Sequence, residues 1–239
     1  MFCHYTARAG RQMISSAKQV VMLTQAHTLA SPPTPLSSHP TNVRLVPEPN
    51  RSFVTMTTNN DDPHEVDAIF QRKHSLRSKL RKDLKNMDPI RRSEEDNAIQ
   101  SIVLEAPWFK ASKSLCAYIS CAALREVDTS RIVSQVLSEP TQVMEASNPI
   151  DLFILPGLAF DRSGRRLGRS GGYYDLFLKK YQELAKQRKW KQPLLVALSY
   201  SLQIVDEGAI AVTSNDVPVD ALVSPAGFIP LSPAALDRL

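Results

Sequence analysis

The chain has 239 residues, 43% of them hydrophobic, which is enough for one sizeable core. It has no stretch approaching the roughly 18 consecutive apolar residues that a membrane span needs, so we expect no membrane partner. The net charge of +5 comes mostly from the N-terminus: residues 1–60 carry five Lys or Arg against one acidic residue, which leaves 24 against 23 for residues 61–239. A nearly neutral body argues against a nucleic-acid partner. Cys3, Cys116 and Cys121 form no C-x-x-C pair and predict neither a zinc site nor a disulfide scaffold.

Residues 1–60 have the composition of a leader. No Asp or Glu occurs from Met1 to Pro47, and Ser, Thr and Pro dominate from Thr28 to Thr58. This pattern is typical of an organellar transit peptide, and a disordered extension without a targeting role has the same composition. The apolar run Val20–Leu23 is too short for a secretory signal. We expect a disordered leader that targets the mitochondrion, with the plastid as the alternative, or the cytosol if translation starts at Met56.

Residues 61–239 alternate between helical and strand patterns. Apolar residues at helical spacing predict a helix from Ile69 to Met87 with an adjacent basic face, and Ser93 with three acidic residues after it predicts the N-cap of a second helix that stops before Pro107. Further helices are predicted at 129–137 and 172–190, and short strands at 114–120, 151–155, 194–199 and 221–223. Strands separated by helices predict an α/β fold in three layers, with a mainly parallel sheet flanked by helices.

A Gly-rich stretch, RLGRSGGYYD, spans Arg166–Asp175 and precedes a predicted helix. A glycine loop before a helix N-terminus can bring backbone N–H groups close to an anion, and Arg166 and Arg169 can each offer paired donors to phosphate. Asp175 supplies a hard oxygen ligand suited to Mg²⁺. The stretch is neither a Walker A motif nor a dinucleotide fingerprint. From these residues alone, a basic turn before a helix and a phosphate cradle stay equally open.

The Gly-rich stretch belongs to a longer segment, ILPGLAFDRSGRRLGRSGGYYDLFL at 154–178. This segment closely resembles the signature of the 5-formyltetrahydrofolate cyclo-ligase family, also called methenyltetrahydrofolate synthetases, of a plant-like kind. The resemblance covers most of residues 66–229 and not the leader. It includes KHSLRSKLR at 73–81, YIS at 118–120, EVDT at 126–129, LLVALSYSLQIVDE at 194–207 and DVPVDAL at 216–222.

The resemblance implies an enzyme that uses ATP and Mg²⁺ to convert 5-formyltetrahydrofolate, including its polyglutamylated forms, to 5,10-methenyltetrahydrofolate with release of ADP and phosphate. The formyl oxygen would attack the γ-phosphate, so that phosphate leaves when the ring closes. By the family pattern, Arg169 would stabilise the transferring phosphoryl group, Ile119 and Glu126 would contact the folate, and Asp175 and Asp216 would hold Mg²⁺. We expect a monomer. The ATP-binding residues would be Lys73, His74, Ser75, Leu76, Arg77, Arg166, Leu167, Gly168, Arg169, Ser170, Gly171, Gly172, Tyr173 and Tyr174.

The same residues have plainer interpretations when each is taken alone. Lys73 and Arg77 would form a solvated basic face, Asp216 would be a loop carboxylate, and Tyr173 and Tyr174 would be core aromatics at a helix start. The functional interpretation is preferred because all of them occur together in the family order.

The chain departs from the family pattern in its middle. Family members have several tens of additional residues, including a strand, between the predicted helix at 129–137 and the strand at 151–155, and here the middle is shortened to about 138–150. Loss of a strand leaves neighbouring strand edges unpaired, and we expect folate recognition to suffer more than nucleotide binding. The alternative function is therefore a catalytically impaired variant that retains only nucleotide or folate binding. Ser170 also stands where the family usually has Gly, which costs about 1 kcal/mol if that position needs a positive φ.

Overall fold

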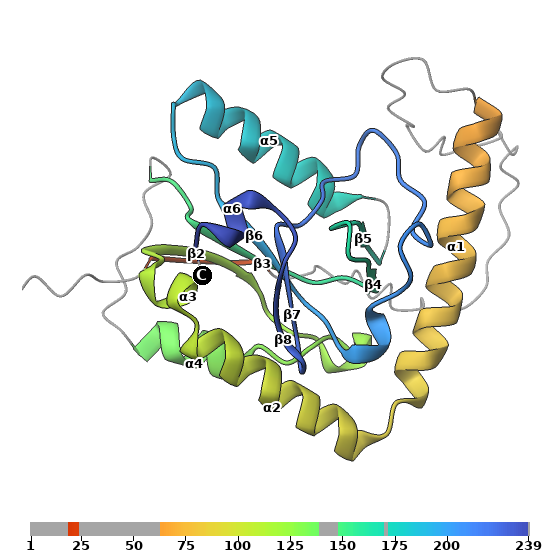
Figure 1. The fold of residues 1–239 in the computed structure, drawn as a ribbon, viewed down its shortest axis with the longest axis horizontal. Helices are drawn as coiled ribbons and strands as arrows, with labels where there is room; N and C mark the ends of the chain where they lie inside the picture. Colours follow the sequence, from red (N-terminus) through yellow and green to blue (C-terminus); the bar gives the residue numbers. More distant parts are fainter. Residues whose placement is uncertain (1–18, 24–62, 139–147, 170–171, 239) are drawn as a thin grey trace, which may run out of the picture.

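The structure is a computed structural model that describes residues 19–23, 63–138, 148–169 and 172–238. Its centre is a six-stranded sheet in the order β1-β2-β3-β6-β7-β8 (Figure 1). Every neighbouring pair is parallel except β7 and β8. The predicted α/β fold with a mainly parallel sheet flanked by helices is confirmed. The strands are β1 (Gln19–Leu23), β2 (Ser114–Tyr118), β3 (Leu152–Leu155), β6 (Leu194–Leu198), β7 (Ala221–Ser224) and β8 (Gly227–Pro230).

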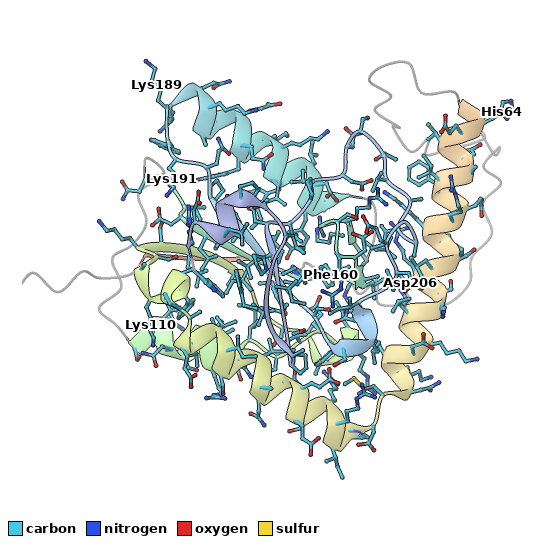
Figure 2. All side chains as sticks on the ribbon, viewed as in Figure 1. His64, Lys110, Phe160, Lys189, Lys191 and Asp206 are labelled. Atoms are coloured by element: carbon cyan, nitrogen blue, oxygen red, sulfur yellow. The ribbon has the colours of Figure 1, made fainter. Side chains whose placement is uncertain are left out.

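Two apolar cores lie on the two faces of the sheet, because successive strand residues point to opposite faces. Leu152 and Ile154 of β3 belong to the core that also contains buried side chains of α2 (Pro89–Glu105) and α4 (Ser130–Ser138). Phe153 and Leu155 belong to the core on the other face, which includes Leu178 of α5 (Tyr173–Gln187). Figure 2 shows Phe160 inside the molecule, whereas Lys110, Lys189 and Lys191 point outward.

The second helix begins earlier than the sequence predicted. Asp88, not Ser93, is its N-cap: one carboxylate oxygen of Asp88 accepts hydrogen bonds from the N–H groups of Ile90 (2.9 Å) and Arg91 (3.0 Å). Pro89 occupies the first helical position, where its fixed φ is favourable and its missing N–H costs nothing. Ser93 is therefore an exposed residue in the second turn. The preceding helix, α1 (Pro63–Asn86), ends where the sequence predicted.

Several short elements were not predicted, because elements of two to five residues carry little periodic signal. The hairpin of β4 (Ala159–Phe160) and β5 (Arg166–Leu167) is antiparallel and contains the first two residues of the Gly-rich stretch. β8 also escaped prediction. The other unpredicted elements are α3 (Pro107–Ala111), α6 (Pro233–Leu236) and the 3₁₀ helices Ala122–Leu124 and Ser201–Gln203.

β1 lies inside the segment that its composition predicts to be a disordered leader. It pairs in parallel with β2 over five residues, from Gln19 opposite Ser114 to Leu23 opposite Tyr118. The remainder of the predicted leader, Ser170, Gly171 and most of the shortened middle lie outside the described residues, and the domain boundaries stay predictions. Among the described helices, none combines the length and apolar character needed to cross a membrane.

Candidate active site

The basic face of α1 lies against the Gly-rich stretch and the loop before β7. Arg77 Nε donates to the carbonyl oxygen of Gly168 (2.9 Å), and Arg81 Nη2 donates to that of Arg169 (2.7 Å). One turn earlier, Lys73 Nζ forms an ion pair of 2.6 Å with Asp216 Oδ2. Lys73 is only 6% exposed, so the plainer interpretation of this face as solvated is wrong for Lys73. Three cationic side chains spaced four residues apart thus bring α1 to two distant loops: Arg77 and Arg81 contact the Gly-rich stretch, 91 and 88 positions away, and Lys73 contacts Asp216, 143 positions away.

Only part of the predicted segment 73–77 reaches these loops. Arg77 contacts the Gly-rich stretch and Lys73 contacts Asp216, whereas the side chains of His74 and Ser75 are exposed on α1. Leu76 packs against the apolar core. The role of these last three in nucleotide binding stays a prediction.

Arg166 and Asp175 form a buried ion pair at the base of the Gly-rich stretch. Arg166 Nη2 lies 2.9 Å from Asp175 Oδ1, and the guanidinium sits over the ring of Tyr174, 5.6 Å from its centroid. The same Asp175 oxygen accepts a hydrogen bond from the Val217 N–H (3.1 Å), which brings Asp175 next to the backbone that follows Asp216. Asp175, in the first turn of α5, therefore lies beside the loop before β7 that carries Asp216.

The rest of the Gly-rich stretch leads into α5. Gly172 is the N-cap residue and has φ of +79°, a left-handed conformation that favours glycine. Leu167 belongs to the apolar core, and Tyr173 is 86% exposed, so the plainer interpretation of Tyr173 as a core aromatic is wrong. The side chain of Tyr173 is therefore accessible to solvent at the start of α5.

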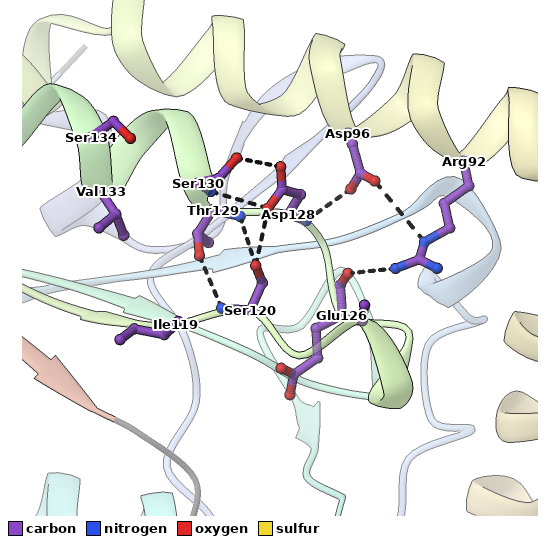
Figure 3. A pocket seen from close by; sticks show the side chains of 11 residues that line it. Arg92, Asp96, Ile119, Ser120, Glu126, Asp128, Thr129, Ser130, Val133 and Ser134 are labelled. Carbon is purple, nitrogen blue, oxygen red and sulfur yellow. Dashed lines mark hydrogen bonds and ion pairs between the residues drawn. The ribbon is translucent and has the colours of Figure 1, made fainter.

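A cavity of about 620 Å³ lies beside this loop, at the end of β2 and the start of α4 (Figure 3). Both predicted folate contacts, Ile119 and Glu126, line it. Glu126 is 3% exposed; its Oε2 accepts a hydrogen bond from the Cys121 N–H (2.9 Å), and its Oε1 lies 3.2 Å from Arg169 Nε. Glu126 thus joins the cavity to the Gly-rich stretch. The other lining residues are Arg92, Asp96, Ser120, Ala122, Asp128, Thr129, Ser130, Val133 and Ser134.

A polar network that was not predicted from the sequence forms one wall of the cavity. Arg92 Nε donates to the hydroxyl of Tyr200 (3.1 Å), and that hydroxyl donates to Asp96 Oδ1 (2.7 Å), which also accepts the Asp128 N–H (2.8 Å). Burial raises the pKa of Asp96, with the hydrogen bond from Asp128 acting against it. The i, i+4 spacing of Arg92 and Asp96 could have predicted a contact between these two side chains. It was not recognised because the helix was predicted to begin at Ser93, after Arg92.

Buried guanidinium nitrogens around the loop lack acceptors. Among the described residues, Arg166 Nε and Arg169 Nη2 are buried without a hydrogen-bond partner, and Arg169 Nε has only the ion pair with Glu126. Burial lowers the pKa of Arg169, and the charge of Glu126 opposes this effect. Unsatisfied buried donors are rare in proteins and fit phosphate oxygens. This region therefore fits the phosphate groups of a nucleotide.

The predicted metal ligands are engaged by cations in this structure. Asp175 pairs with Arg166 and Asp216 with Lys73, and the described residues contain no group of three or more His, Cys, Asp or Glu side chains able to hold a metal ion. Mg²⁺ commonly takes only one or two carboxylates together with phosphate oxygens and waters. The two carboxylates fit Mg²⁺ that arrives with a nucleotide better than a permanently bound ion.

Sequence comparison identifies the family. A profile of the 5-formyltetrahydrofolate cyclo-ligase family matches residues 137–225. The mitochondrial 5-formyltetrahydrofolate cyclo-ligase of Arabidopsis thaliana is 47% identical over 247 aligned positions, which cover 82% of this chain and 89% of that protein. A probable 5-formyltetrahydrofolate cyclo-ligase of Caenorhabditis elegans is 23% identical over 202 positions, 66% of this chain and 95% of that protein. The chain belongs to the 5-formyltetrahydrofolate cyclo-ligase family, a family of ligases.

Solved structures agree with this fold. The NMR structure of Aquifex aeolicus 5,10-methenyltetrahydrofolate synthetase matches with a TM-score of 0.54 and 25% identity, over 66% of this chain and 92% of that one. A 5,10-methenyltetrahydrofolate synthetase from Mycoplasma pneumoniae matches with a TM-score of 0.50 and 22% identity, over 64% and 98% of the two chains, and supports the fold alone.

The sequence alignments also contain many positions that this chain does not fill. The share matched to the Arabidopsis protein, 82% of 239 residues, is about 196 residues over 247 positions, which leaves about 51 positions of the alignment without a residue of this chain. In the alignment with the C. elegans protein, 66% of 239 residues are matched over 202 positions, so about 44 positions have no residue of this chain. Gaps of this size match the several tens of residues expected to be absent from the middle, and their position there stays a prediction.

Proposed function

We propose that this chain converts 5-formyltetrahydrofolate to 5,10-methenyltetrahydrofolate in a reaction that uses ATP and Mg²⁺ and releases ADP and phosphate. The observation that carries the proposal is the ion pair between Arg169 and Glu126, because it joins a loop of unsatisfied guanidinium donors to a cavity large enough for a folate head group. Membership of a cyclo-ligase family supports the same chemistry.

The nucleotide would lie between α1 and the Gly-rich stretch. Arg166 and Arg169 would donate to its phosphates, and Gly168 and Gly172 leave room for the main chain to approach them. When bound, ATP supplies the phosphoryl group that makes the formyl oxygen a good leaving group. Arg169 would stabilise charge on that group, since a buried cation acts strongly where water is excluded.

Asp175 and Asp216 would hold Mg²⁺ together with phosphate oxygens of the nucleotide. In the present structure Lys73 and Arg166 neutralise these carboxylates. Exchange of Lys73 for Mg²⁺ at Asp216 would leave the Lys73 ammonium group available to a phosphate, so that every charge keeps a partner.

The folate would occupy the cavity lined by Ile119 and Glu126. Ile119 is 42% exposed and offers an apolar surface to a ring system, and Glu126 offers a carboxylate to ring N–H groups. The same cavity would accept polyglutamylated substrate at its open side. We propose a monomer without nucleic-acid or membrane partners, located in the mitochondrion, and the mitochondrial relative supports the location.

A spectrophotometric assay tests this function. Purified protein with ATP, Mg²⁺ and 5-formyltetrahydrofolate is expected to generate the near-ultraviolet absorbance of methenyltetrahydrofolate, and omission of either ATP or Mg²⁺ should abolish it. Arg169→Ala should remove the activity, whereas Arg162→Ala, an exposed arginine of the neighbouring hairpin, should retain it. Equal activity of the two variants would refute the role of the Gly-rich stretch.

A second candidate function is binding without turnover, and the unfilled positions of the sequence alignments favour it. A chain that leaves about 51 positions of its alignment with the Arabidopsis relative unfilled has less surface to hold the folate in place. Isothermal titration with ATP·Mg and with 5-formyltetrahydrofolate distinguishes the two functions. Binding of both ligands with no product would favour this second function, and turnover at the rate of a full-length relative would exclude it.

A further inference from the structure

The outer edge of β2 is covered by a segment from near the N-terminus. β2 pairs with β3 on one side, from Leu115 opposite Leu152 to Ala117 opposite Ile154. On its other side it pairs with β1, which closes the sheet order at that end. Every residue of β2 is buried. Without β1, a fully buried parallel strand would become the edge of the sheet, with a row of unpaired N–H and C=O groups.

The sequence of β1 suits this place. QVVML has two adjacent β-branched residues and four apolar residues in a row, as is typical of a strand within a parallel sheet. The same run is too short for a secretory signal, so its apolar character is otherwise unexplained. Targeting alone does not require a leader to pair with the main sheet over five residues.

β1 also ends next to the cavity. Leu23, its last residue, is paired with Tyr118, and Ile119, the next residue after Tyr118, lines the cavity. In Figure 3 the red strand β1 ends below Ile119. Loss of β1 would therefore loosen the backbone that positions Ile119 as well as the edge of the sheet.

We propose that Gln19–Leu23 is a constitutive edge strand of the folded domain, so that any N-terminal cleavage compatible with the native fold ends before Gln19. The pairing concerns the fold and is independent of the proposed catalytic activity.

Proline substitutions in the full-length chain test the pairing. Successive N–H groups of a strand point to opposite edges, so proline at alternate positions removes a hydrogen bond to β2 or an N–H that faces away from it. Among Val20→Pro, Val21→Pro and Met22→Pro, the middle variant and the two outer variants should differ. The substitution or substitutions that remove a hydrogen bond to β2 should speed amide hydrogen exchange in residues 115–118 by about tenfold or more. Those that remove an N–H facing away from β2 should speed it much less.

No change in β2 exchange in any of the three variants would overturn the proposal. The same change in all three would overturn it as well, because a strand in fixed register must respond with a period of two. Hydrogen exchange is measured without substrate turnover. Failure of the proposed β1 pairing can therefore be distinguished from failure of the proposed function.

Truncation provides an independent test. A chain that lacks residues 1–18 keeps β1 and should have the Tm and the sedimentation coefficient of the full chain. A chain that lacks residues 1–24 exposes the β2 edge, and it should melt at a lower temperature and associate with increasing concentration, a sign of edge-to-edge pairing. Identical melting and sedimentation of the two truncated chains would show that β1 contributes nothing to the sheet.

Discussion

The Nε atom of Arg169 lies 3.2 Å from a carboxylate oxygen of Glu126, across the boundary between the Gly-rich stretch and the cavity. Both side chains are largely buried, at 13% and 2% exposure. Burial makes each charge depend on the other, because neither is well solvated. One ion pair thus joins the Gly-rich stretch to the cavity, and it would couple the proposed nucleotide and folate sites.

Removal of Glu126 should destabilise the protein. Glu126→Ala leaves Arg169 buried without its counter-ion, and breaking a buried pair from one side typically costs about 3–5 kcal/mol. The double variant Glu126→Ala/Arg169→Ala should lose less than the sum of the two single variants. Urea unfolding of the four proteins measures this coupling, and additive losses would show that the two charges do not interact.

Arg81 is expected to position the Gly-rich stretch, since its guanidinium donates to the Arg169 carbonyl. Arg81→Ala removes one exposed, charge-assisted hydrogen bond worth about 1 kcal/mol, so the KM for ATP should rise about fivefold with little change in kcat. Lys82→Ala, an exposed neighbour on the same helix, is the matched control. A fall in kcat with unchanged KM would contradict a positioning role.

Gly172 and Gly168 should differ in their response to alanine. Gly172→Ala places a Cβ on a residue with φ of +79°, which should cost about 1–2 kcal/mol of stability. Gly168 has no such conformation, and its nearest neighbour to an added Cβ is a guanidinium nitrogen of Arg166 at 3.5 Å. Gly168→Ala should therefore unfold close to the wild-type temperature. Thermal unfolding compares the two variants, and equal Tm values would contradict the left-handed conformation of Gly172.

The start of α2 can be tested in the same way. Asp88→Ala removes the carboxylate that caps the N–H groups of Ile90 and Arg91 and should cost about 1 kcal/mol. Ser93→Ala, which replaces the N-cap predicted from sequence, should have an effect within about 0.5 kcal/mol, because Ser93 is exposed within the helix. A larger loss from Ser93→Ala, measured by chemical denaturation, would restore the original prediction.

Cys116 should resist alkylation at alkaline pH. Burial raises the pKa of its thiol from 9.0 to about 12, so the folded chain holds this proton more tightly than the unfolded chain. Stability contributed by this thiol is present below pH 9 and is lost as the pH rises towards 12. Between pH 8 and 10, iodoacetamide should modify the partly exposed Cys121 at least about tenfold faster, as measured by peptide mass spectrometry. Equal rates in folded protein would show that Cys116 is accessible.

Local patterns predicted most of the large elements of this fold. The helical spacing predicted from Ile69 to Met87 lies in α1 except for its last residue, and the apolar runs at 114–120 and 151–155 contain β2 and β3. Such elements are readable because burial on one face or on both faces imposes a period on the residues themselves. Short elements such as the β4–β5 hairpin and β8 had too few residues to show one.

The sequence by itself determined the α/β class, the helices and strands that build it, and a Gly-rich stretch equally compatible with a basic turn or a phosphate cradle. Only the tertiary structure decided which side chains meet there: Lys73 with Asp216, 143 positions away, and Arg92 with Tyr200, 108 positions away. It also decided that Gln19–Leu23 joins the sheet beside β2. Local periodicity specifies which face of an element is buried, whereas the order of strands in the sheet determines what that face meets.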